Sequence, residues 1–192
     1  MSENIYTDRE RWSSETKLIA RYEYRYEDGR HAYYVDKGRQ PSGEKAFRIR
    51  RVNMIKYKER FEDDQKADIL PGLGDARPVL YRLPELIAAS ADTLIHFCEG
   101  EKDVETLVAR GYVATTAPFG AKMPWRDDYT KFFRDRDVLL FPDNDDEGRE
   151  HMDDVARKLY HTARSIKIVR LPGLKVGGDV TDWIEMREAV HG

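Results

Sequence analysis

Four short apolar segments, separated by stretches with helical periodicity, constrain the fold of this 192-residue chain more than any other feature. They span roughly 94–98, 112–116, 138–142 and 165–171, and each is apolar enough to form a buried strand. Between them, apolar residues recur at spacings of three and four over 104–108 and 152–159, as in helices that cover a sheet. This alternation predicts an α/β domain over residues 76–192, with a parallel four-stranded Rossmann-like sheet flanked by helices.

A basic and β-rich segment precedes this domain. Residues 18–26, 32–35 and 46–52 have the alternation or the aromatic content of strands, and Asp28-Gly29 is a two-residue turn signal between the first two. From residue 17 to 60 the chain carries 13 Lys and Arg against 6 Asp and Glu, a balance of +7, although its total charge is −3. We therefore expect a small basic N-terminal lobe over 17–75, after a flexible lead-in over 1–16.

Details within and after this lobe are also predicted. In the third strand, Phe47 and Ile49 are expected to pack on one face, while Arg48 and Arg50 on the other meet phosphate or simply solvent. The tyrosines of the first two strands, Tyr24, Tyr26 and Tyr33, are expected in the core. Pro and Gly residues mark 59–75 as a loop at the domain junction, and 77–90 is expected to form a short strand that enters a helix.

Several classes of protein are excluded or disfavoured by composition. A single cysteine, Cys98, excludes an internal disulfide and a cysteine zinc cluster. The chain has no GxxxxGK[ST] phosphate loop, so an autonomous ATP motor is not expected. No apolar run approaches the roughly 18 residues of a membrane span, and the polar N-terminus is unlike a signal peptide. We expect a cytoplasmic protein that does not associate with membranes.

Acidic residues follow two of the four predicted strands. Glu99-Gly100 comes after the first, with Asp103 one helical turn later, and Asp143-Asn144-Asp145 comes after the third. Because the carboxyl ends of parallel strands meet at one edge, these carboxylates are expected to lie together. Carboxylates so close repel unless a proton or a cation lies between them, and Mg²⁺ prefers carboxylate oxygens. The alternative is that the acids only cap the helices that follow them and stabilise their N-termini.

The two motifs, in this order, resemble those of the Toprim domain, which carries Glu-Gly after one strand and Asp-x-Asp after another in primases, topoisomerases and some nucleases. The resemblance covers about half of the chain. It implies that Glu99, Asp143 and Asp145 are catalytic and bind Mg²⁺ or Mn²⁺, with Asp179 in the segment 178–183 as a further ligand. Gly100, Asp103 and Gly148 would support the motifs. Asp182, close to Asp179, could instead cap the last helix.

The segment LYRLPELIAA followed by EGEKD resembles the primase-like regions of phage and mobile-element replication proteins. This implies a nucleotidyltransferase that synthesises or extends primers on single-stranded DNA from nucleoside triphosphates. A replicative helicase or a zinc-binding domain on another chain would be candidate partners. Basic residues would contact nucleic acid or nucleotide: Arg48, Arg50, Arg51, Lys56, Lys102 and Arg149. A metal-dependent nuclease and a noncatalytic nucleic-acid-binding module remain alternatives.

Overall fold

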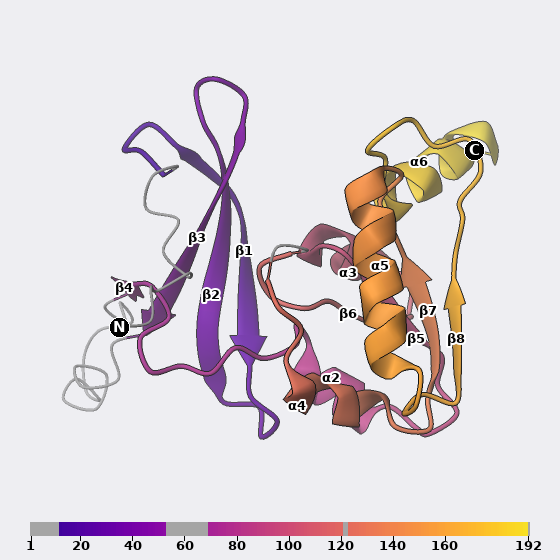
Figure 1. Ribbon diagram of the computed structural model, residues 1–192. Coiled ribbons are helices and arrows are strands. Elements are labelled where there is room, and N and C mark those ends of the chain that lie inside the picture. Colours follow the sequence, from indigo (N-terminus) through magenta and orange to yellow (C-terminus); the bar gives the residue numbers. More distant parts are fainter. Residues whose placement is uncertain (1–11, 53–68, 121–122, 192) are drawn as a thin grey trace. The chain divides into compact units, whose positions relative to one another are not determined.

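The chain forms an antiparallel sheet followed by an α/β unit (Figure 1). The structure, a computed structural model, describes residues 12–52, 69–120 and 123–191. Two compact units divide between Pro78 and Val79, slightly beyond the expected boundary after residue 75. The second unit holds a four-stranded parallel sheet flanked by helices, which confirms the predicted fold class at this level. None of the helices in the described ranges is long and apolar enough to cross a membrane.

The antiparallel sheet of the first unit has the strand order β1-β2-β3-β4. Its strands are β1 (Lys17–Arg25), β2 (His31–Arg39), β3 (Lys45–Val52) and β4 (Ile69–Pro71). Tyr24 and Tyr33 are fully buried, and their rings stack at 4.7 Å, as expected of core residues. Strand β4 was wrongly predicted as part of a loop, because a three-residue strand that pairs only through its backbone with β3 has no periodic pattern. The part of that loop over 59–68 lies outside the described residues.

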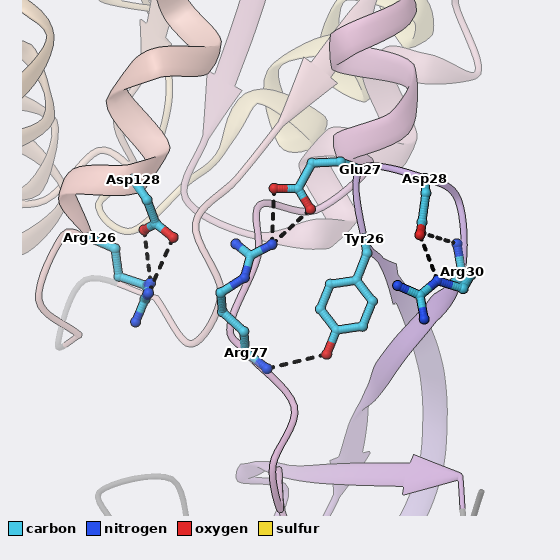
Figure 2. A network of polar contacts seen from close by, with 7 residues as sticks. All are labelled: Tyr26, Glu27, Asp28, Arg30, Arg77, Arg126 and Asp128. Carbon is cyan, nitrogen blue, oxygen red and sulfur yellow. Dashed lines mark hydrogen bonds and ion pairs between the residues drawn. The ribbon is translucent and has the colours of Figure 1, made fainter.

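Tyr26 lies at the sheet margin instead of in the core. Its hydroxyl accepts a hydrogen bond from the Arg77 backbone N–H at 3.3 Å, and the Arg77 guanidinium pairs with Glu27 at 2.7 Å (Figure 2). The Arg30 guanidinium pairs with Asp28 at 2.6 Å within the β1–β2 turn. These contacts attach the end of the first unit to that turn. In the second unit, Figure 2 also labels the local ion pair between Arg126 and Asp128.

A buried carboxylate organises the other face of the antiparallel sheet. Asp36 is fully buried, and it accepts hydrogen bonds from Arg21 Nε at 2.6 Å and Arg48 Nε at 2.9 Å. Burial alone would raise the pKa of Asp36, but these two guanidinium groups lower it. Trp12, in the segment expected as a lead-in, stacks on the Arg48 guanidinium at 3.9 Å, and Gly38 lies against it. Arg48 therefore has a structural role.

The neighbouring arginines of β3 also bond within their own unit. Arg50 Nη2 donates to the carbonyl oxygen of Ile69 at 3.0 Å, and Arg51 Nη1 donates to that of Pro71 at 2.9 Å. On the face opposite to Arg48 and Arg50, Ile49 is buried. Phe47 on that face is 40% exposed, so its predicted burial is wrong. The pattern of β3 places both side chains on one face, yet that face is covered only along part of the strand.

Replacing Asp36 with alanine is expected to lower the free energy of unfolding by about 2 kcal/mol. The substitution leaves two guanidinium groups without their shared partner, and their roughly one-third exposure moderates the cost. Urea denaturation measures the change. Glu44→Ala, an exposed acid near the same sheet, is the matched control and should change stability by less than about 0.5 kcal/mol. Equal losses in the two variants would contradict the structural role of Asp36.

The parallel sheet of the second unit has the strand order β6-β5-β7-β8. Its strands are β5 (Ile95–Cys98), β6 (Val113–Thr115), β7 (Asp137–Phe141) and β8 (Ser165–Ile168). The two central strands supply the fully buried residues Ile95, Phe97 and Leu140. Strand β8 is shorter than predicted and largely exposed, because it is an edge strand that pairs with β7 alone.

Among the described residues of this unit, the helical segments are α2 (Leu83–Ala88), α3 (Glu101–Val108), α4 (Asp127–Thr130), the 3₁₀ helix η1 (Lys131–Phe133), α5 (Asp146–Leu159) and α6 (Val180–His191). In Figure 1, α5 lies in front of the sheet. The short strand predicted before α2 is absent from the described chain at 78–82, where the Tyr81 N–H donates to the Thr116 carbonyl at 3.0 Å. Helices α4 and η1 were not predicted, and they bury Tyr129 and Phe133.

The strand order reverses between β5 and β7. The chain leaves β5 toward β6 on one side and later leaves β7 toward β8 on the other. Right-handed connections then place α3 and α5 on opposite faces of the sheet, so that the carboxyl ends of β5 and β7 lie where the two helical layers diverge. Ligands of open α/β sheets bind at such a point. The acidic motifs predicted from the sequence follow these two strands.

Candidate active site

Glu99 and Asp143 meet at the carboxyl ends of β5 and β7. The register pairs Cys98 with Phe141, so each strand ends at nearly the same level. Glu99 Oε1 accepts a hydrogen bond from the Asp143 backbone N–H at 2.7 Å. The structure thereby brings the first predicted motif onto the second at the point where the strand order reverses.

Gly148 allows this contact. A Cβ at position 148 would lie 2.2 Å from Glu99 Oε1 and 2.8 and 2.9 Å from the backbone O and N of Asp143. The Glu99 carboxylate therefore occupies the space that any side chain at 148 would need. Gly100 differs, because its φ of −136° is open to all residues and a Cβ there would meet its nearest atom at 3.9 Å. Neither backbone conformation nor space therefore requires a glycine at position 100.

Asp145 is the N-cap of α5. Its Oδ1 accepts a hydrogen bond from the Gly148 N–H at 2.8 Å, and Asp146 and Glu147 lie in the first turn. The alternative that these acids cap the following helix is therefore correct for one oxygen of Asp145. Capping uses only that oxygen, so the same carboxylate could also bind a cation.

A second acidic cluster lies beside the first and joins α3 to the start of α6. Asp179 Oδ1 accepts from the Asp182 N–H at 2.8 Å, so α6 is capped by Asp179 and not by Asp182, which was the alternative considered from the sequence. The other oxygen of Asp179 forms an ion pair with Lys102. Asp103 is only 5% exposed and accepts from the Thr181 hydroxyl at 2.6 Å. Thr181 was not predicted as a functional residue, since nothing in its spacing indicates this contact.

The electrostatics of the site favour protons or cations. Burial, followed by the negative charges of Glu99, Asp103, Asp179 and Asp145, raises the pKa of Asp143 to about 8. Burial likewise raises the pKa of Asp103 to about 6 and raises that of Glu99. At Asp179 burial raises the pKa, but the Lys102 ammonium and the Asp182 N–H are among the groups that together lower it below its usual value.

The residues fit a divalent cation in part. Within the described ranges, no three acidic, His or Cys side chains enclose a ready-made metal position. However, Mg²⁺ usually takes only one or two protein carboxylates together with water and substrate phosphates. The half-buried Asp143 carboxylate receives no hydrogen bond from the part of the chain that the structure describes. Asp143 is therefore the group most suited to a metal ion here, with Asp145 beside it.

Two of the cationic residues predicted as nucleotide contacts, both in the second unit, are paired with acids. Lys102 pairs with Asp179, and Arg149 Nη2 pairs with Asp146 at 2.6 Å on the exposed side of α5. Lys56 lies outside the described residues. Within the second unit, Lys102 and Arg149 are thus held in two separate ion pairs.

No protein-family model matches the chain, and no curated protein sequence matches it. Solved structures do match. The bacteriophage T7 complex of a lagging-strand DNA polymerase with primase domains of two gp4 subunits, bound to an RNA/DNA hybrid and dTTP, contains a chain with 17% identity and a TM-score of 0.52. That match covers 89% of this chain and 71% of the other.

Two further matches are the Aquifex aeolicus primase, with its zinc-binding and RNA polymerase domains, and the DnaG catalytic core. The first has 16% identity, a TM-score of 0.53 and coverage of 88% of this chain and 38% of the other. The second has 19% identity, a TM-score of 0.53 and coverage of 91% and 49%. The chain therefore has the fold of DNA primase catalytic cores, although it spans less than half the length of these two chains.

Proposed function

We propose that this chain is a primase-like nucleotidyltransferase core of the Toprim type, which joins nucleoside triphosphates on single-stranded DNA. The observation that carries the proposal is the contact between Glu99 and the Asp143 backbone, at the reversal point of a sheet with the primase fold. The match to solved structures supports the fold, and the acidic residues at the strand ends support phosphoryl transfer.

Asp143 and Asp145 would hold the metal ion, with Glu99 beside them and Asp179 as a further acid. Magnesium or manganese, when bound, would supply positive charge to the phosphate oxygens. Glu99 fixes the Asp143 backbone through its 2.7 Å hydrogen bond, so it orients the strand end that carries both aspartates. Its raised pKa also suits it to accept or hold a proton near the reacting oxygen.

The basic lobe would attract the template and the nucleotide by its charge. Arg50 and Arg51 donate to carbonyl oxygens, which are neutral, so their positive charges are not cancelled by these bonds. Lys102 and Arg149 would contact nucleotide phosphates after leaving their acidic partners. A replicative helicase or a zinc-binding domain on another chain would recruit the template.

The test is an assay of oligoribonucleotide synthesis on single-stranded DNA with Mg²⁺ and nucleoside triphosphates. Glu99→Gln is expected to reduce synthesis about a hundredfold, because it removes the charge but retains an oxygen that can accept from Asp143. Glu150→Gln, an exposed site on α5, is the matched control and should leave synthesis unchanged. Cleavage of DNA without triphosphates would instead identify a nuclease. Absence of any product, together with no effect of Glu99→Gln, would overturn the proposal.

A further inference from the structure

Asn144 joins the end of β7 to the loop over 174–178 through hydrogen bonds of both its backbone and its side chain. Its backbone N–H donates to the Gly178 carbonyl at 2.8 Å, and its own carbonyl accepts from the Gly177 N–H at 3.0 Å. Its side-chain Nδ2 donates to the carbonyls of Leu174 at 2.9 Å and Lys175 at 3.0 Å. The two hydrogens of one amide group thus serve two carbonyl oxygens of the loop.

The loop that Asn144 holds leads directly to Asp179. Most of its residues are exposed, and Val176 is 86% exposed, so burial contributes little to its position. Segments with little buried surface open locally at low free energy unless hydrogen bonds hold them. The described hydrogen bonds from Asn144 therefore matter more here than they would in a packed segment.

We propose that Asn144 is a positioning residue: its side-chain amide fastens the 174–178 loop to the end of β7 and thereby sets Asp179 beside Asp143 and Asp145. Only a side chain of this length with two amide hydrogens can serve both carbonyls. A leucine at position 144 has a similar size but no hydrogen-bond donor. An aspartate there would place a carboxylate oxygen against the carbonyl oxygens of Leu174 and Lys175. The expected effect on synthesis rests on the proposed function, whereas the effect on the loop does not.

The first experiment measures amide hydrogen exchange by NMR in Asn144→Leu. Exchange at Gly177 and Gly178 is expected to accelerate roughly tenfold or more, because two hydrogen bonds of the loop are lost. The indole N–H of Trp183, which donates to the Pro172 carbonyl at 3.2 Å, should change its chemical shift. Protection within α5 should remain, which shows that the variant is folded. Val176→Ala, in the same loop, is the matched control and should behave as wild type.

The second experiment measures primer synthesis against magnesium concentration. Asn144→Leu is expected to raise the magnesium concentration for half-maximal synthesis roughly tenfold, with the KM for nucleoside triphosphate unchanged. Asn144→Asp, which has the same shape, should show the same accelerated exchange and serves if the leucine variant does not fold. Unchanged exchange in the folded variants would overturn the inference and leave the proposed function intact. Faster exchange with an unaltered magnesium requirement would also overturn it. If wild type makes no primer, the proposed function fails, while the exchange experiment still decides whether Asn144 fastens the loop.

Discussion

Gly148→Ala is expected to lower the free energy of unfolding by roughly 3 kcal/mol and to remove activity from the candidate site. Alanine is the better helix former by about 1 kcal/mol, so propensity alone would predict stabilisation. The steric clash of the added Cβ outweighs this gain, so the net change in stability is a loss. The added Cβ would lie 2.2 Å from Glu99 Oε1, which can move, but also 2.8 and 2.9 Å from backbone atoms of Asp143, which cannot move cheaply.

Gly100→Ala is the matched control for this prediction, since it changes the other motif glycine where a Cβ meets nothing closer than 3.9 Å. It should alter stability by less than about 1 kcal/mol. Urea denaturation measures both changes, and primer synthesis measures the site. If Gly148→Ala proves as stable and as active as Gly100→Ala, the close approach of Glu99 to position 148 is wrong.

In the absence of divalent metal, stability should fall as pH rises from about 4 to about 8. Asp143 has a pKa of about 8 in the folded chain, whereas an unfolded aspartate has a pKa of about 3.9. Between these values the folded state retains a proton that the unfolded state has lost, so each pH unit costs up to about 1.4 kcal/mol. Asp103, with a pKa of about 6, adds to the slope in the lower part of this window.

Asp143→Asn isolates this effect. The stability of the variant relative to wild type should be greatest near pH 8 and should fall by up to about 4 kcal/mol toward pH 5, because the folded wild type holds a proton that the unfolded chain has lost across this range. Saturating Mg²⁺ should stabilise wild type near pH 8 but not the variant. Thermal unfolding across pH, with and without Mg²⁺, measures all of these changes. A stability difference that is independent of pH would contradict the raised pKa of Asp143.

The central part of the fold could be predicted from the sequence because burial leaves a pattern. Strands β5 and β7 are apolar except for His96 and Asp137, and the periodicity of α5 follows from the face it packs. The edges of the sheets could not be predicted as well. Strand β8 is exposed on one side, and β4 is too short to show alternation, so neither carries the signal of a buried element.

The candidate site shows the same division. Acidic residues after two parallel strands indicated that Glu99 and Asp143 would lie together, because topology fixes where strand ends meet. The partners of the other residues depend on tertiary contacts that no spacing encodes. The Lys102 pair with Asp179 and the Thr181 bond to Asp103 connect α3 with the start of α6, far apart in the chain. The ion pair of Arg48 with Asp36 is likewise a tertiary contact that no spacing in the sequence indicates.

The hydrogen bond between Glu99 and Asp143 spans 44 positions of the chain. While the polypeptide is being translated, the site cannot form until β7 has paired with β5. An incomplete or unfolded polypeptide therefore cannot hold Glu99 and Asp143 close together. If the site binds Mg²⁺ as proposed, binding should therefore appear only when the parallel sheet has closed, and a bound ion would indicate that this sheet is complete.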